Sequence, residues 1–281
     1  MKKQKNKFKV RHEKIKLGAH TVRLLILSPL NQSKEKVPGV LWIHGGGYQA
    51  GHASNVFFTR ALSLVVKFGM VLVAPDYRLS KHHPYPAALN DCHAALLWLR
   101  DHAEELGVRT DQIMVGGESA GGGMTVALCM LARDRKEVNI AFHMPLYPML
   151  DDRDTPSSRD NHGRGWNTRK NHQGWQRYLG DLYGTDRVPK YASAARETDY
   201  SGLPPCYTFV ADGEPFLDET VAYARHLREA GVEAEADVYH GDLHGFDLLR
   251  PWEKESKKAR RKLLRVYAEK IASGRQDPSE S

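Results

Sequence analysis

One serine of this chain lies in a pattern that is typical of a catalytic nucleophile. Ser119 is the centre of a Gly-x-Ser-x-Gly pentapeptide at 117–121, with an apolar run before it and a helical pattern over 124–131 after it. A sharp turn between a strand and a helix needs flanking glycines and exposes the serine hydroxyl above a sheet. The N–H of Ala120 and the helix dipole would then favour negative charge at Ser119. A glycine-rich turn with a helix-capping serine is the ordinary alternative.

A serine hydroxyl needs a neighbouring base to take its proton as it attacks a substrate. Among the fourteen histidines, His244 is the best candidate for this base because it lies in a short loop after the last expected strand and precedes a glycine. His240 is the nearest rival. It lies inside the strand pattern, from which its ring would point sideways.

The base in turn needs a carboxylate that fixes its tautomer. The loop after the expected strand at 207–210 offers Asp212 and Glu214, and Asp218 further along suits the N-cap of the next helix. The chain order serine, acid, histidine is the order of an α/β-hydrolase. Spacing alone does not choose between Asp212 and Glu214.

A glycine-rich loop could supply donors for the oxyanion of the transition state. His44 is followed by Gly45, Gly46 and Gly47 directly after an expected strand. Glycines let backbone N–H groups approach a substrate carbonyl, and each such donor typically contributes about 3 kcal/mol. Together with Ala120, these three glycines are therefore candidates for an oxyanion hole.

The elements that must position these residues alternate between apolar strands and helical patterns from about residue 20 onward. This alternation predicts an α/β fold with a mostly parallel central sheet and helices on both faces. We expect strands over 21–27, 37–44, 70–74, 113–115, 141–147, 207–210 and 236–239 and helices over 57–68, 86–107, 124–131, 218–230 and 253–271.

The alternation breaks between residues 151 and 202. This stretch is polar and rich in Arg, Asn, Gly and Trp, with one modest helical pattern at 175–183. Fifty residues without structure are improbable inside a compact domain. We therefore expect a cap-like insertion in one α/β domain spanning 20–272, with a basic tail at 1–19 and a frayed end at 273–281.

The charge of the chain is concentrated at its start. The net charge is +7, and residues 1–16 carry eight basic residues against one acid, so the remainder is balanced. A second basic cluster lies on the last expected helix, between Lys254 and Arg265. Without interleaved aromatic residues or a recognisable nucleic-acid module, these clusters favour solvated surfaces over nucleic-acid binding.

The remaining bulk features concern the compartment. The 281 residues contain no apolar run of about 18 residues, so no membrane span is expected, and the basic start lacks the apolar core of a signal peptide. Cys92, Cys129 and Cys206 lie far apart in apolar segments, as reduced core cysteines do. The sequence thus predicts a cytoplasmic protein.

Six short motifs in order resemble the bacterial hormone-sensitive-lipase-like (family IV) carboxylesterases of the α/β-hydrolase superfamily over roughly residues 20–272. They are His-Gly-Gly-Gly at 44–47, Asp-Tyr-Arg-Leu at 76–79, Pro-Tyr-Pro-Ala at 84–87, Gly-Glu-Ser-Ala-Gly-Gly at 117–122, Gly-Leu-Pro-Pro at 202–205 and His-Gly-Phe at 244–246. This resemblance implies an α/β-hydrolase fold, hydrolysis of short-chain carboxylic esters such as acetyl esters, and neither a metal nor an organic cofactor. A homodimer is consistent with it.

The resemblance also assigns the site residues. It implies that Ser119 is the nucleophile and His244 the base, with Ala120 and the glycines of the His44 loop, foremost Gly46 and Gly47, as oxyanion donors. The family's acid is the first carboxylate of a pattern like Asp-Pro-Leu-x-Asp-Glu, which here reads Glu-Pro-Phe-Leu-Asp-Glu from Glu214. That match selects Glu214 and leaves Asp212 as the fallback.

Two questions about the substrate stay open at this point. Family members usually begin with a helical cap segment, whereas here the first expected strand lies near residue 20, so we expect a cap built from 151–202 over an open, shallow acyl pocket. Tyr48, Glu118, Trp166 and Trp175 are candidate substrate-binding residues. The same residues could also cleave amides, and a non-catalytic ligand-binding member of the fold is a further alternative.

Overall fold

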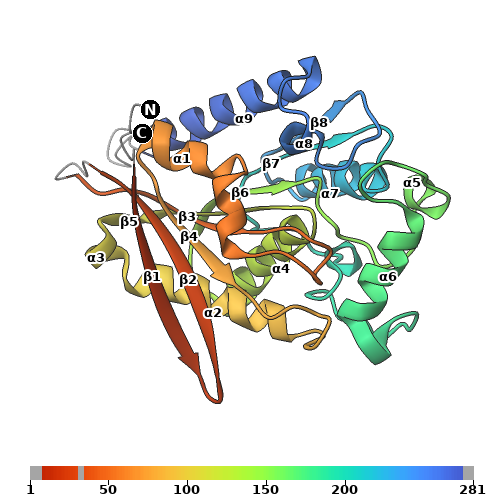
Figure 1. Cartoon of the computed structure of the whole chain (residues 1–281), viewed down its shortest axis with the longest axis horizontal. Coiled ribbons are helices and arrows are strands. Elements are labelled where there is room, and N and C mark those ends of the chain that lie inside the picture. The colour runs from red at the N-terminus through yellow and green to blue at the C-terminus, as the bar shows by residue number, and fades with distance from the viewer. Residues whose placement is uncertain (1–7, 31–34, 275–281) are drawn as a thin grey trace, which may run out of the picture.

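A single twisted sheet of eight strands organises the computed structural model, which describes residues 8–30 and 35–274 (Figure 1). The spatial order is β1-β2-β4-β3-β5-β6-β7-β8; β1 pairs with β2, and β2 with β4, antiparallel, whereas all other pairs are parallel. The strands are β1 (Phe8–Leu17), β2 (His20–Pro29), β3 (Val37–Ile43), β4 (Val71–Asp76), β5 (Val108–Glu118), β6 (Ile140–Leu146), β7 (Cys206–Ala211) and β8 (Ala234–Tyr239).

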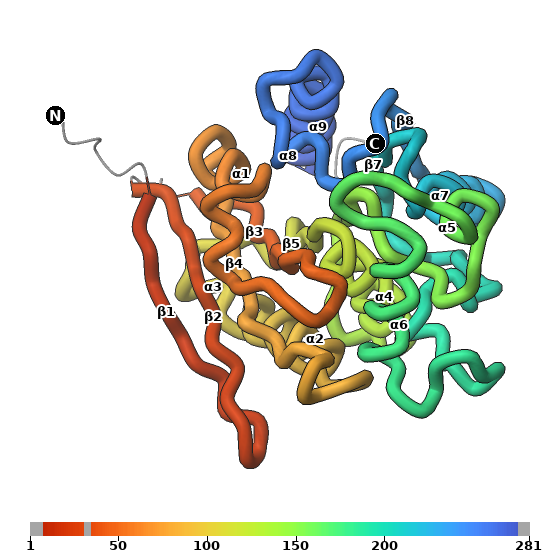
Figure 2. The backbone as a smooth tube through the Cα atoms, turned by 45° about the vertical axis from the view of Figure 1, so that its right-hand side comes forward, coloured from red at the N-terminus to blue at the C-terminus, as the bar shows by residue number. Residues whose placement is uncertain are grey.

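Helices cover both faces of this sheet, which confirms the expected α/β architecture. Figure 2 shows α1 and α9 above the sheet and α2 and α4 below it. The helical segments are η1 (Ala53–Phe57), α1 (Ala61–Phe68), α2 (Ala87–Asp101), α3 (Ala103–Leu106), α4 (Ala120–Arg135), α5 (Pro156–Arg159), α6 (Thr168–Leu179), η2 (Gly180–Leu182), η3 (Ala194–Arg196), α7 (Leu217–Glu229), α8 (Phe246–Leu249) and α9 (Lys254–Ser273).

The central strands are buried on both faces, as their continuous apolar sequence requires. Residues 40–43 of β3 and 71–74 of β4 are at most 1% exposed. Parallel strands with both faces covered read as unbroken apolar runs rather than as an alternation. Their carboxyl ends meet at one edge of the sheet, where β3, β5, β7 and β8 lead into the loops that carry the candidate site residues.

The expectation of a basic tail at 1–19 is wrong for the residues that the structure describes. Phe8–Leu17 forms β1, which pairs with β2 in an unbroken antiparallel register from Phe8 opposite Pro29 to Leu17 opposite His20. Lysines and arginines suit such an edge strand because their charge discourages pairing with another chain. Residues 1–7 and 275–281, which belong to the predicted tail and frayed end, lie outside the described residues.

The polar stretch at 151–202 forms a compact insert that contains α5, α6 and two 3₁₀ turns (Figure 2). Its main helix spans Thr168–Leu179 rather than the predicted 175–183. The Asn167 side chain accepts the Lys170 N–H and so begins the helix early, and Gly180, with φ of 56°, ends it. Within residues 8–30 and 35–274, no helix is both long and apolar enough to span a membrane.

Candidate active site

The turn between β5 and α4 holds Ser119 in a strained backbone conformation. Its φ and ψ are 57° and −119°, a region that non-glycine residues rarely adopt. The Ser119 N–H donates to Leu146 O at 2.9 Å, and its carbonyl accepts from Met149 N at 3.1 Å. A Cβ on Gly121 would lie 2.1 Å from Ile43 O, so only glycine fits there. The surroundings therefore determine the strained turn, which leaves Ser119 mostly buried with its hydroxyl directed to His244.

Ser119, His244 and Glu214 form a continuous chain of hydrogen bonds. The Ser119 hydroxyl lies 2.8 Å from His244 Nε2, and His244 Nδ1 donates to Glu214 Oε2. Glu214 is fully buried, and its other oxygen accepts the Ala211 N–H at 2.7 Å. With Nδ1 protonated toward the carboxylate, Nε2 is free to accept the serine proton.

Asp212, the other candidate acid, lies apart from this chain. Its carboxylate accepts from His240 Nδ1 and from Gly241 N, each at 2.9 Å. His240 is exposed. These bonds hold the pKa of Asp212 below its usual value despite some burial. Asp212 therefore fixes the turn that precedes the His244 loop, while the two ring nitrogens of His244 are bonded to Glu214 and Ser119.

The glycine loop after β3 lies against the serine turn. A Cβ on Gly45 would lie 3.2 Å from Ser119 Cβ, and Gly46 and Gly47 have φ values of 125° and 59°. Within the described part of the chain, the N–H groups of Gly46 and Gly47 donate to no protein acceptor. Two unused donors beside a serine hydroxyl can serve a developing oxyanion.

His44 supports this loop as a neutral, buried side chain. Its ring stacks on Tyr77 at a centroid distance of 4.2 Å, its Nδ1 donates to Gly45 O at 2.8 Å, and the Tyr77 hydroxyl donates to His44 O at 2.9 Å. Burial lowers the pKa of His44 to about 4. His44 is thus a structural residue of the loop.

Three aromatic rings surround the imidazole of His244. Tyr147 and Phe216 approach it edge to face at centroid distances of 5.0 and 5.1 Å, and Trp166 lies at 6.4 Å. Neither Tyr147 nor Phe216 was predicted as a site residue. The signal in the sequence that could have indicated them is their position, since Tyr147 directly follows β6 and Phe216 lies two residues after Glu214 in the acid motif.

Of the four candidate substrate-binding residues, Trp166 alone borders this site. A Cβ on Gly47 would lie 2.3 Å from the Trp166 indole, so that ring packs directly on the glycine loop. Tyr48 stacks on Tyr178 at 3.9 Å, and Trp175 is 1% exposed beside both tyrosines. The prediction is therefore wrong for Tyr48 and Trp175, which are core residues.

The prediction is also wrong for Glu118, the residue before the serine. Its side chain is buried, and its Oε2 accepts the Trp42 indole N–H at 2.9 Å. Burial raises the pKa of Glu118 to about 8, with a smaller contribution from the nearby charge of Asp247. Glu118 is the last residue of β5 and its side chain enters the core, whereas Ser119 begins the turn, whose backbone conformation directs the serine hydroxyl toward His244.

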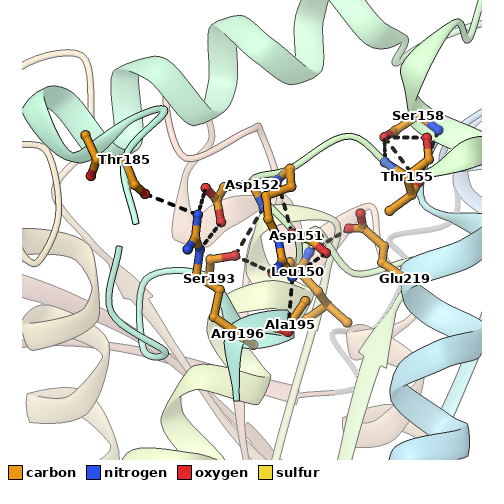
Figure 3. Close-up of polar contacts among 12 residues, drawn as sticks. Leu150, Asp151, Asp152, Thr155, Ser158, Thr185, Ser193, Ala195, Arg196 and Glu219 are labelled. Atoms are coloured by element: carbon orange, nitrogen blue, oxygen red, sulfur yellow. Dashed lines mark hydrogen bonds and ion pairs between the residues drawn. The ribbon is translucent and has the colours of Figure 1, made fainter. Parts of the chain in front are cut away.

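The insert is tied to the segment that follows β6 (Figure 3). Leu150 N donates to Glu219 Oε1 of α7 at 2.7 Å, and Leu150 O accepts from Ser193 Oγ at 2.9 Å and from Ala195 N at 3.1 Å. Burial raises the pKa of Glu219 well above its usual value. Leu150, which directly precedes the insert, is therefore bonded to residues 193 and 195 within it and follows Met149, whose N–H donates to Ser119 O.

Asp218 anchors the first helix of the insert and does not cap α7, contrary to the expectation. Its Oδ2 accepts the Ser157 N–H at 2.6 Å, and its own N–H donates to Ser157 Oγ at 3.1 Å. The N-cap position of α7 is occupied by Phe216.

Among the residues that the structure describes, no group of three or more His, Cys, Asp or Glu could hold a metal ion.

Comparisons with known proteins agree with this architecture. The model of a family described as the alpha/beta hydrolase fold matches residues 40–248. The chain is 31% identical over 219 residues to Esterase LipI of Mycobacterium tuberculosis, covering 78% of this chain and 68% of that one. It is 30% identical to an arylesterase of Saccharolobus solfataricus, covering 84% and 76% of the two chains. A solved structure titled bacterial heroin esterase superposes with a TM-score of 0.89 at 33% identity, over 95% of this chain and 85% of that one.

Proposed function

Because the chain belongs to the hormone-sensitive-lipase-like carboxylesterases of the α/β-hydrolase superfamily, we propose that it hydrolyses short-chain acyl esters through an acyl-enzyme on Ser119. Membership in this family makes it a carboxylic ester hydrolase. The observation that carries the assignment of residues is the hydrogen-bond chain from Ser119 through His244 to Glu214.

In the first half of the proposed reaction, Ser119 Oγ attacks the ester carbonyl carbon while its proton passes to His244 Nε2. The carbonyl π electrons move to the oxygen, which receives hydrogen bonds from Ala120 N–H and from Gly46 and Gly47. Glu214 stabilises the imidazolium that forms. Collapse of the tetrahedral intermediate breaks the bond to the alcohol oxygen, and the alcohol leaves with the proton from His244.

In the second half, water replaces the alcohol. His244 takes a proton from the water as its oxygen attacks the acyl carbon, and the same donors hold the second oxyanion. Expulsion of Ser119 Oγ, which regains its proton from His244, releases the carboxylic acid. Every proton taken up by His244 is returned, so the cycle ends with the three residues in their starting protonation states.

The position of Trp166 supports the preference for short acyl groups. Its indole lies on Gly47, beside both the proposed oxyanion donors and His244. A bulky ring at this place leaves little room for a long chain on its side of the carbonyl. We expect p-nitrophenyl acetate and butyrate to have higher kcat/KM than the dodecanoate, and Trp166→Ala to reduce that difference. A preference for the dodecanoate in the parent enzyme would contradict the assignment of chain length.

The ester series also tests the nucleophile. Ser119→Ala should abolish hydrolysis of p-nitrophenyl acetate and labelling by a fluorophosphonate probe, whereas Ser201→Ala, at an exposed serine, should change neither. Retained activity in Ser119→Ala would overturn the mechanism. Failure of the parent enzyme to react with the probe would instead favour the ligand-binding alternative. Higher turnover of p-nitroacetanilide than of the acetate ester would identify an amidase.

A cytoplasmic location and a homodimer remain part of the proposal. The three cysteines are free and buried, which suits a reducing compartment. Strand β8 is an open edge of the sheet and Val238 on it is 50% exposed, which would suit pairing with a second copy. Light scattering after size exclusion tests the dimer, and a monomer at all concentrations would contradict it.

A further inference from the structure

We propose that Asp247 is a positioning residue for His244 and acts through the hydroxyl group of Tyr147. This inference rests on the function proposed above, since it concerns the orientation of the base in that reaction. Among the described residues, neither forms a hydrogen bond with Ser119, His244 or Glu214. Both belong to a buried polar network behind the imidazole.

Tyr147 is held directly against the imidazole. Its ring meets the His244 ring edge to face, at a centroid distance of 5.0 Å and an interplanar angle of 79°. The residue follows β6 with a φ of 35°, and its N–H donates to Phe209 O at 2.8 Å. A tyrosine that is 1% exposed needs a partner for its hydroxyl, and that partner is Asp247 Oδ1 at 3.1 Å.

Asp247 in turn is buried and paired. It lies in α8, three residues after His244, and is 1% exposed. Its Oδ2 accepts the Nε–H of Arg60, which precedes α1, at 3.1 Å. Burial raises the pKa of Asp247, while Arg60 and Tyr147 act in the opposite direction. The network thus joins the segments before α1 and after β6 to the short helix that follows the base.

The geometry of the imidazole explains why such a network would matter. Both ring nitrogens are engaged, Nε2 by Ser119 and Nδ1 by Glu214, so the two bonds fix the ring along the line between these partners. They leave the tilt of the ring about that line less restricted. Tyr147 and Phe216 restrict this tilt through their edge-to-face contacts, at 5.0 and 5.1 Å.

The chemistry of the network indicates that it orients the Tyr147 and His244 rings and does not only stabilise the fold. Phe216 makes its contact with His244 through an apolar ring, so packing by itself needs no hydroxyl group. The buried ion pair of Arg60 and Asp247, to which the Tyr147 hydroxyl is bonded, costs desolvation, and apolar residues of similar size are often equally stable in such places. What the hydroxyl–carboxylate bond adds is a defined direction for the Tyr147 ring, and through it for His244.

The central experiment is a double-mutant cycle on ester hydrolysis. Tyr147→Phe keeps the ring but removes its bond to Asp247, and Asp247→Asn keeps the shape but removes the charge. We expect each to lower kcat about tenfold with KM changed less than about twofold, because a misoriented base weakens only the transition state. In the double variant the loss of kcat should be close to that of either single variant, since both substitutions break the same hydrogen bond between Tyr147 and Asp247.

A matched control separates positioning from general stability. Tyr207→Phe removes another bond from a buried tyrosine to an aspartate, from Tyr207 to the half-buried Asp237 at 2.8 Å, in the strands β7 and β8. Its kcat should stay at the parent value, with thermal stability measured for all variants. A parent-like kcat in Tyr147→Phe and Asp247→Asn would overturn the proposal, as would losses that multiply in the double variant or appear equally in Tyr207→Phe. Those outcomes leave the esterase function intact, which Ser119→Ala tests separately.

Discussion

Glu214 and Asp212 lie two residues apart in the loop after β7, yet they bond different histidines. Loss of the Glu214 charge leaves His244 without its acceptor, so the wrong tautomer forms. We expect Glu214→Gln to lower kcat by roughly a thousandfold or more, a loss of the size seen when triad acids of other serine hydrolases are neutralised. Steady-state hydrolysis of p-nitrophenyl acetate measures this.

Asp212→Asn is the matched control for this substitution. Among the residues that the structure describes, its carboxylate accepts from the exposed His240 and the Gly241 N–H alone, so kcat should remain within about twofold of the parent value, as surface substitutions usually allow. If Asp212→Asn were the more damaging change, Asp212 and not Glu214 would be the acid of the reaction.

The burial of Glu118 predicts that the free energy of unfolding depends on pH. Its pKa is about 8 in the folded protein, against an ordinary value of 4.5, because it is buried. Between these values the folded state keeps the proton that the unfolded state releases, so the free energy of unfolding falls as pH rises from 4.5 to 8. The loss across this window is on the order of 5 kcal/mol.

Glu118→Gln removes this proton linkage while its amide oxygen can still accept from Trp42. Urea unfolding at pH 5 and pH 8 should show a smaller difference for Glu118→Gln than for the parent protein. An unchanged difference would mean that Glu118 is not the group that binds the proton.

At the scale of single residues, local sequence patterns predicted the candidate site residues that lie directly after strands. Ser119 and the His44 loop follow strands directly, and His244 lies in a short loop, so their environment is encoded nearby. Glu214 needed the acid motif, because its burial and its bond to His244 depend on how β7 and β8 lie together. The burial of Tyr48 depends on its contacts with Trp175 and Tyr178 of α6, far along the chain, which no pattern near Tyr48 reports.

At the scale of helices and strands, the segments that are buried on both faces were the ones predicted most accurately from the sequence. The parallel strands β3 and β4 are apolar runs, and they were predicted within one or two residues. Strand β1 was missed because none of its residues is fully buried and basic residues are frequent in it. Its apolar residues keep no single alternation, since Phe8 and Val10 are at even positions and Ile15 and Leu17 at odd ones, and the net charge of the segment favoured a solvated tail.

The insert depends on a few polar anchors, and Asp218 is one of them. Its two bonds with Ser157 join the start of α5 to α7. Asp218→Ala should loosen 151–165, raise KM several-fold and change kcat less, because substrate binding next to Trp166 needs an ordered insert whereas the chemistry lies on the sheet. Limited proteolysis and steady-state kinetics measure both effects.

Asp181→Ala is the comparison for that variant, since Asp181 is an exposed acid of the same insert. It should resemble the parent protein in KM and in cleavage rate. Equal behaviour of the two variants would show that the bonds between Asp218 and Ser157 do not order the insert.

At the scale of the whole molecule, the net charge of +7 does not predict how stability changes in acid. That change depends on which individual histidines are buried. Burial lowers the pKa of both His44 and His143 to about 4. The unfolded chain takes up protons at these residues near pH 6.5. As pH falls from 6.5 toward 4, the unfolded state therefore binds more protons than the folded state, and the free energy of unfolding decreases.

His143 allows this dependence to be tested away from the site. Its Nδ1 donates to Pro205 O at 3.1 Å and its Nε2 accepts the Tyr223 hydroxyl at 2.7 Å, both in the core. Replacing both partners, as His143→Leu with Tyr223→Phe, avoids an orphaned polar group. Each buried histidine should account for about 3 kcal/mol across the window. Urea unfolding between pH 6.5 and 4.5 should thus give a shallower slope for the double variant. A slope equal to that of the parent protein would mean that other groups cause the acid sensitivity.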